Sequence, residues 1–237
     1  MHNRIIVVSG GTRGIGSAVS ERHAIAGDIV FSLCLNPENN SRTHANIHVI
    51  RCDVCDHKAV KNCIEQILSE VANIDILVNC AGIQQPPSAG LEYIDNEDWR
   101  KVFGTNLDGV FHLCKEVIPG MKARREGVII NMASVAATDG YPMACAYAAS
   151  KSALIGLTKS LAKELAAYNI RVNAIMPSLT MTDAALGLPA ETLERFVNLV
   201  PLARIALPED IAGVEFFLSS TDASYITGEL VRVAGGR

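Results

Sequence analysis

The sequence has no strong excess of charge of either sign and no long apolar run. Its 21 basic and 25 acidic residues give a net charge of −4, and the longest basic cluster, residues 122–125, is too short for a nucleic-acid-binding arm. No stretch approaches the ~20 apolar residues of a membrane-spanning helix. We therefore expect a protein that binds neither nucleic acid nor a membrane.

Disulfide and metal frameworks are also missing. The seven cysteines are odd in number and show no framework spacing. Cys52 and Cys55 form a Cys-x-x-Cys, but a zinc site needs a second pair of ligands, and none is present. The apolar run from Ile5 to Val8 is too short for a secretory signal. The sequence predicts free thiols, no metal, and a soluble protein of the cytoplasm.

What is present is a regular alternation of apolar strand and helix patterns. The chain has 237 residues, of which 49% are hydrophobic, enough for the core of one large domain. Strands are expected at residues 4–9, 29–35, 47–51, 74–78, 127–132, 171–176 and 230–233. Helices are expected at residues 15–26, 59–71, 99–121, 146–167 and 208–219.

This alternation predicts an α/β fold with a doubly wound, Rossmann-like parallel sheet and helices on both of its faces. We expect one domain over residues 1–237, with a cofactor half at about 1–100 and a catalytic half at about 101–237. Residues 182–200 are less regular and are predicted to form a lid over a site.

A glycine-rich turn follows the first expected strand and leads into a helix. It reads Gly10-Gly11-Thr12-Arg13-Gly14-Ile15-Gly16. Glycines allow a tight turn and a close approach to a pyrophosphate, while the helix N-terminus offers free N–H groups. This context predicts a dinucleotide site, and the alternative is a βα turn without a ligand.

The end of the second expected strand carries no acid. NAD-selective folds usually place one there for the ribose hydroxyls, but this chain has Cys34, Leu35 and Asn36. Arg13 can instead face a 2′-phosphate, unless it is only a solvated turn residue. The sequence favours NADP(H), with NAD(H) as the alternative.

Tyr147 and Lys151 are four residues apart in an expected helix and therefore lie on one face. A cation beside a phenol favours the phenolate and lowers its pKa, which prepares a general acid/base for an alcohol or alkoxide. Taken alone, this pair is a pattern that chance produces often.

Four motifs in order give the pair its weight. They are Gly10-x-x-x-Gly14-Ile15-Gly16, Asn79-Cys80-Ala81-Gly82, Asn106 within a helical pattern, and Ser134 thirteen residues before Tyr147. Together they resemble the short-chain dehydrogenase/reductase family over essentially the whole chain. Residues 225–229 make the resemblance closest to its 3-oxoacyl-(acyl-carrier-protein) reductase branch.

The resemblance implies a catalytic tetrad of Asn106, Ser134, Tyr147 and Lys151. Tyr147 would be the acid/base, Ser134 a donor to the substrate oxygen, Lys151 a contact of the nicotinamide ribose, and Asn106 the support of a water chain. The implied cofactor-binding residues are Gly10, Thr12, Arg13, Gly14, Ile15, Gly16, Asn36, Asp53, Val54, Asn79, Ala81, Gly82, Tyr147, Lys151, Pro177 and Thr182.

The chain departs from the family pattern at two positions within its motifs. Cys80 replaces an asparagine, and Ser178 stands where glycine is usual, which would strain the serine if that position needs an unusual backbone angle. Arg125 matches a position that docks acyl carrier protein, whereas Tyr168 replaces an arginine at another.

The resemblance implies a hydride transfer between a nicotinamide and a small-molecule carbonyl or alcohol, in a homo-oligomer, either a tetramer or a dimer. The substrate is left open among ketones, 3-oxoacyl groups, sugars, polyols, steroids and secondary metabolites. Its choice is expected to depend on Gln84, Gln85, the loop after Ser134 and residues 182–200. A non-catalytic nucleotide-binding redox sensor is the alternative of another class.

Overall fold

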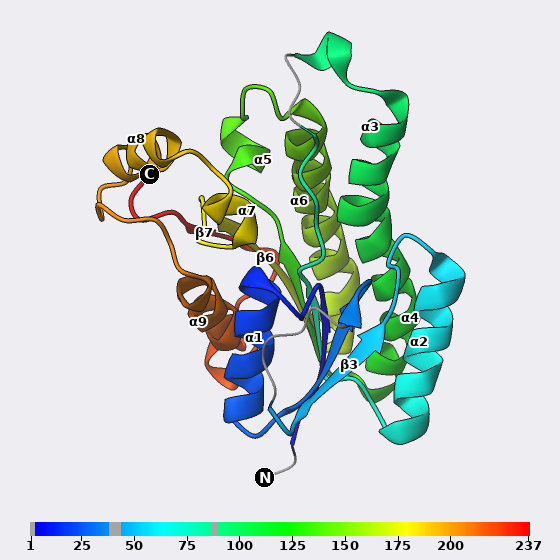
Figure 1. Cartoon of the computed structure of the whole chain (residues 1–237). Helices are drawn as coiled ribbons and strands as arrows, with labels where there is room; N and C mark the ends of the chain where they lie inside the picture. The colour runs from blue at the N-terminus through cyan, green and yellow to red at the C-terminus, as the bar shows by residue number, and fades with distance from the viewer. Residues whose placement is uncertain (1–2, 38–43, 87–89) are drawn as a thin grey trace.

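The computed structural model describes residues 3–37, 44–86 and 90–237, which form a single parallel sheet flanked by helices (Figure 1). The sheet has seven strands in the order β3-β2-β1-β4-β5-β6-β7. They are β1 Ile5–Ser9, β2 Ile29–Cys34, β3 Ile47–Arg51, β4 Ile76–Asn79, β5 Gly127–Met132, β6 Ile170–Pro177 and β7 Leu230–Val233. The predicted doubly wound fold is confirmed, and each expected strand is present within two residues at either end.

Helices cover both faces of the sheet. The long ones are α1 Gly14–Ile25, α2 His57–Glu70, α4 Gly109–Arg124, α6 Cys145–Leu165 and α9 Pro208–Leu218. Two separate apolar cores follow from the alternation of side chains along each strand: Val7 packs with α2, α4 and α6, whereas Ile6 packs with α1 and α9. Figure 1 shows α1 and α9 together on one side of the sheet and α2 and α4 on the other.

The order of the strands locates the site. β1 lies between β2 and β4, so the chain winds outward in opposite directions from the β1–β4 pair. Ligands of such sheets bind beyond the carboxyl ends of the strands at this switch point. The glycine turn after β1 and the Asn79–Gly82 motif after β4 therefore meet at the same edge, and Ser134 follows the next strand, β5.

The helix expected at residues 99–121 is interrupted, which corrects the prediction of one continuous helix. α3, Asn96–Phe103, passes into one π-helical stretch, Gly104–Asp108, before α4 begins at Gly109. Such a bulge adds a residue to the turn, and it commonly occurs at functional sites. Gly109 is tightly packed, because a Cβ there would lie 2.7 Å from Val54 Cγ2.

A row of buried polar groups joins β4, β5 and α6. Asn79 and Asn131 are directly paired in the register of the sheet, and Asn79 Nδ2 donates to Asn131 Oδ1 over 2.8 Å. Asn131 Nδ2 donates in turn to Thr158 Oγ1 of α6 over 2.9 Å. All three side chains are inaccessible to solvent. The amides thus connect β4 through β5 to α6.

Buried ions join α1 to α9. His23 Nδ1 lies 2.7 Å from Asp28 Oδ2, and its Nε2 lies 2.9 Å from Glu215 Oε2. Arg4 Nη2 donates to the same Asp28 oxygen over 2.6 Å. Burial lowers the pKa of His23, but Glu215 and Asp28 together outweigh it and raise that pKa to about 9. The imidazolium is therefore the stable form at neutral pH.

The segment after β6 holds two short helices, α7 Asp183–Leu186 and α8 Ala190–Asn198. Another short helix, α5 Ala136–Asp139, follows β5, and 3₁₀ turns occupy Leu91–Tyr93, Ala166–Tyr168 and Thr221–Ala223. In Figure 1 α7 and α8 lie on the same side as α5, above the carboxyl ends of the strands. Within the described ranges, no helix is long and apolar enough to cross a membrane.

Candidate active site

A cavity of about 620 Å³ opens at the carboxyl ends of β4, β5 and β6. Of the residues expected to act in catalysis or to bind the cofactor, it brings together seven: Ile15, Gly82, Ser134, Tyr147, Lys151, Pro177 and Thr182. The remaining expected residues lie outside its lining. Among the tetrad, Asn106 alone is set back from the cavity wall, where it is fully buried.

Tyr147 stands in the first turn of α6, and Ser134 follows β5. Burial raises the pKa of the Tyr147 phenol, and a hydrogen bond from Ser134 lowers it by less. The sequence-based expectation of a lowered pKa is thus wrong for the protein without its cofactor. Lys151 fails to reverse the effect because its Nζ lies 5.9 Å from the centre of the tyrosine ring and is engaged elsewhere. The phenol is protonated at neutral pH, as a proton donor must be.

Lys151 lies at the inner end of the cavity. Its Nζ donates to the backbone oxygen of Met132 over 2.7 Å. Burial lowers the pKa of this ammonium to about 8. A Cβ on Gly82 would approach Nζ to 3.2 Å, so the glycine keeps the space beside the ammonium open. A ligand can therefore reach Lys151 past the loop after β4.

Asn106 fixes the loop after β4 against the catalytic helix. Its Oδ1 accepts from the Ile83 amide over 2.8 Å, and its Nδ2 donates to the Ile83 oxygen and to Ser150 Oγ, both over 3.0 Å. Ser150 Oγ then donates to the backbone carbonyl oxygen of Tyr147 over 2.7 Å. Both amide protons are used within the protein, and one lone pair of Oδ1 is left for a water molecule.

Gln85 holds the beginning of α6. Its Oε1 accepts from the backbone N–H groups of Ala146, over 2.8 Å, and Tyr147, over 3.4 Å, while Nε2 donates to the Met143 oxygen. The sequence predicted that Gln85 selects the substrate. Gln85 lines the cavity, so this stays a prediction. It also caps the helix that carries Tyr147, which no local pattern reveals because Ala146 lies 61 positions further along the chain.

The turn after β1 suits a dinucleotide. Gly10 and Gly14 adopt positive φ angles of 66° and 53°, which favour glycine. A Cβ at Gly16 would lie 2.2 Å from the Gly10 oxygen. The N-terminus of α1 has no side-chain cap and no acidic residue in its first turn. Its free N–H groups and positive dipole end therefore fit a pyrophosphate.

Other expected cofactor contacts surround this turn. A Cβ on Gly10 would lie 3.0 Å from Ala81, and one on Gly14 would lie 3.0 Å from Thr182 Cγ2, so both residues border the turn. Asp53 Oδ1 accepts from the Cys55 amide over 2.9 Å, which shapes the loop after β3. The buried Asn79 Oδ1 has no partner. Arg13 and Asn36 are exposed at the ends of the turn and of β2, and Thr12 and Val54 are buried.

The two departures from the family motif leave the backbone unstrained. Ser178 is absent from the residues with positive φ, and its amide donates to the Val233 oxygen over 3.0 Å. The strain considered for this serine is therefore not found. Cys80 lines the cavity, and burial raises the pKa of its thiol to about 12. At neutral pH the Cys80 thiol is thus a small neutral group.

The outer wall of the cavity contains Tyr141, from the loop after Ser134, and Phe196, from the expected lid, together with Arg237, which was not identified from the sequence. Tyr141 and Phe196 stack with ring centres 6.3 Å apart, and the guanidinium of Arg237 lies 5.6 Å from the centre of the Phe196 ring. We call these three residues the outer wall. Arg237 could not be expected here, because only the folding of β7 beside β6 brings it to the cavity.

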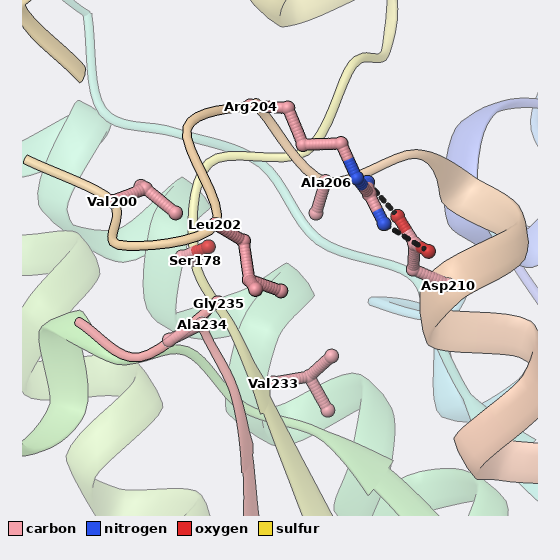
Figure 2. A pocket seen from close by; sticks show the side chains of 9 residues that line it. All are labelled: Ser178, Val200, Leu202, Arg204, Ala206, Asp210, Val233, Ala234 and Gly235. Atoms are coloured by element: carbon pink, nitrogen blue, oxygen red, sulfur yellow. Dashed lines mark hydrogen bonds and ion pairs between the residues drawn. The ribbon is translucent and has the colours of Figure 1, made fainter. Parts of the chain in front are cut away.

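A second, smaller cavity of about 210 Å³ is lined on one side by Ser178, which also lines the larger cavity (Figure 2). Its charged side chains, Arg204 and Asp210, point toward each other and form a two-bond ion pair of 2.5 and 2.8 Å. The rest of its lining is largely apolar. It therefore offers no group for the chemistry of the larger cavity.

The side chains around Arg125, the position that resembles a docking site for acyl carrier protein, already have partners within the protein. Arg125 Nη2 donates to the Ala167 oxygen over 2.6 Å, and Lys122 lies over the Tyr168 ring at 5.0 Å. Tyr168 thus packs against the basic residues of this region in place of an arginine.

Comparisons with known proteins agree with this geometry. A family profile described as enoyl-(acyl carrier protein) reductase matches residues 10–237. The 3-oxoacyl-(acyl-carrier-protein) reductase FabG of Thermotoga maritima is 35% identical, over 100% of this chain and 98% of the relative. A 3alpha-hydroxysteroid dehydrogenase of Mediterraneibacter gnavus is 37% identical, over 99% and 97%.

A solved structure shows the same fold with a cofactor bound. The 3-ketoacyl-(acyl-carrier-protein) reductase of Brucella melitensis, complexed with NADH, has a TM-score of 0.93 and 30% identity, covering 99% of this chain and 98% of its own. The sheet order, the glycine turn and these matches over the whole chain lead to one assignment. The chain belongs to the short-chain dehydrogenase/reductase family and is an oxidoreductase that uses a nicotinamide cofactor.

Proposed function

We propose that the protein is an NADP(H)-dependent reductase of ketones, including 3-oxoacyl groups, in which Tyr147 supplies the proton. The observation that carries this proposal is that Ser134, Tyr147 and Lys151 line one cavity together with Ile15 of the glycine turn. A bound nicotinamide supplies the hydride. The chain's own residues orient the substrate and move the proton.

Each residue of the proposed tetrad has a distinct task. The raised pKa of Tyr147 keeps its hydroxyl protonated, ready to donate to the oxygen of a carbonyl as negative charge develops there. The Ser134 hydroxyl donates to the same oxygen. Lys151 holds ribose hydroxyls and, as a cation nearby, stabilises the phenolate that remains after transfer. Asn106 positions Tyr147 through Ser150 and can retain a water with its remaining lone pair.

Replacing Tyr147 with Phe tests the proton transfer. We expect turnover to fall by about 10²- to 10⁴-fold, because a positioned acid contributes that much, while NADPH affinity changes little. Turnover is followed at the nicotinamide absorbance with a panel of ketones, and affinity by quenching of intrinsic fluorescence. Undiminished activity would refute the mechanism, whereas tight cofactor binding with no activity on any substrate would favour a redox sensor.

The preference for NADP(H) rests on Arg13, which is exposed at the N-cap of α1. Gly10 and Gly11 both donate to the Leu33 oxygen, so the turn lies against the end of β2, where an adenosine ribose would bind. A guanidinium there can pair with a 2′-phosphate. Arg13→Ala should weaken NADPH binding by roughly 10-fold or more and leave NADH nearly unchanged. An enzyme that prefers NADH and ignores the substitution would contradict this role.

Oxidation of a secondary alcohol at the same site is the second candidate, because a hydroxysteroid dehydrogenase is 37% identical over nearly the whole chain. We also propose a homo-oligomer, tetramer or dimer, which is supported by the exposed apolar Phe111 on α4 and Trp99 on α3. Light scattering coupled to size-exclusion chromatography measures the number of subunits.

We propose a cytoplasmic location as well. All seven cysteines are free, which suits the reducing cytoplasm.

A further inference from the structure

We propose that Arg237 forms a subsite for an anionic group of the substrate, a carboxylate or a phosphate, at the end of the cavity away from the glycine turn. This inference rests on the proposed function, since it assumes that the carbonyl lies at Tyr147. It adds a substrate class that the tetrad does not define.

The geometry holds the guanidinium in place. It lies 5.6 Å from the centre of the Phe196 ring, and Phe196 is stacked on Tyr141 at an interplanar angle of 17°. A cation over an aromatic face is attracted by the ring electrons. The guanidinium carries five N–H donors, which can bind the oxygens of an oxyanion in pairs.

The charge around the outer wall favours an anion. Asp139 also lines the cavity, but Arg232 neutralises it through contacts of 2.9 and 2.5 Å. That pairing holds the pKa of the Asp139 carboxyl at about 2, so it is ionised, and the nearby charge of Arg237 contributes to the same lowering. Within residues 3–37, 44–86 and 90–237, the Arg237 guanidinium forms no ion pair of its own. The side chains of Asp139, Arg232 and Arg237 together therefore carry one net positive charge.

The space between Tyr147 and the outer wall is mainly apolar. Pro142, Met143, Leu179 and Leu188 line the cavity, together with residues 133–136. An aliphatic chain can pack there without leaving polar groups unpaired. The proposed ligand is therefore a ketone with an anionic group at the far end of a short chain. Its carbonyl would lie at Tyr147, its aliphatic chain along the apolar walls, and its anionic group at the guanidinium of Arg237.

The test compares charged and neutral forms of the same ketones. Methyl ketones with a terminal carboxylate on one to four methylene groups are assayed beside their methyl esters, with NADPH, in the wild type and in Arg237→Gln. We expect kcat/KM for the best keto acid to fall roughly 10- to 100-fold in the variant, as for loss of a charge-assisted pair, and the esters to change little. Arg195→Gln is the control, because Arg195 is an exposed arginine of α8 outside the cavity.

A second arm distinguishes the source of the anion. Acetoacetyl-pantetheine and its 4′-phosphate are compared in the same variants, and dependence on Arg237 with the phosphate alone would assign the subsite to a phosphate. The proposal would be overturned if Arg237→Gln lowered kcat/KM equally for the keto acids and their esters, or equally for the charged and uncharged thioesters.

Calorimetric titration of the same ligands measures the subsite without turnover. Binding of a keto acid that requires Arg237, without any reduction, would refute the proposed function and leave the subsite standing. Binding of acids and esters that does not depend on Arg237 would overturn the subsite even in an active enzyme.

Discussion

Gln85 connects the loop after β4 to the first turn of α6, so its truncation to alanine tests whether a remote side chain positions Tyr147. The substitution removes the acceptor of the Ala146 and Tyr147 amides and the donor to the Met143 oxygen. Ala146 is fully buried, so water cannot replace the lost acceptor at its amide.

The magnitude follows from the buried amide. An unsatisfied buried donor costs about 1–3 kcal/mol, a range that overlaps the effect of losing a helix N-cap. For a chain of this size, 1 kcal/mol corresponds to a change of roughly 2–4 °C in Tm. Because the loosened turn carries Tyr147, kcat should fall while cofactor affinity stays near that of the wild type.

The assay combines urea unfolding, thermal melting and steady-state kinetics. Gln84→Ala is the control for stability, because Gln84 is the exposed neighbour of Gln85. Gln85→Glu separates the two halves of the interaction, since it keeps an acceptor for the helix amides but removes the donor to Met143. We expect it to recover part of the lost stability. A free energy of unfolding for Gln85→Ala equal to that of Gln84→Ala, with unchanged kcat, would refute the reasoning.

Two further predictions concern the packing and the buried ions. Gly109→Ala places a Cβ 2.7 Å from Val54 Cγ2 and should destabilise the protein by about 1–3 kcal/mol in urea unfolding, whereas Gly213→Ala, on α9 with no heavy atom within 4 Å, should be neutral or stabilising. The pKa of His23 is raised from 6.5 to about 9, so its stabilisation is complete below pH 6.5 and is lost as pH rises through 9. Urea unfolding between pH 6 and 10 should show a loss of up to about 3 kcal/mol, and a His23→Gln variant that keeps the same slope would contradict this assignment.

The sequence was sufficient for the fold, and with the family resemblance it named the residues Ser134, Tyr147 and Lys151 that the structure brings to one cavity. Apolar runs, glycine spacing and the Tyr147–Lys151 interval are all properties of short segments. The π-helical stretch at Asn106 was missed because the apolar pattern continues across it. The direction of the Tyr147 pKa shift was missed because it depends on burial and on where the Lys151 ammonium points. The helix-capping contacts of Gln85 and the place of Arg237 in the cavity were missed because their partners are remote along the chain.

The paired amides of Asn79 and Asn131 also have a consequence for how the chain finds its fold. In a sheet whose strands are rich in Val and Ile, many strand alignments bury similar apolar area and are close in energy. Sliding β5 by one residue along β4 would face each amide with an apolar side chain and leave it unbonded inside the protein. The hydrogen bonds among the two asparagines and Thr158 therefore stabilise the native register of β4 and β5 relative to registers shifted by one residue.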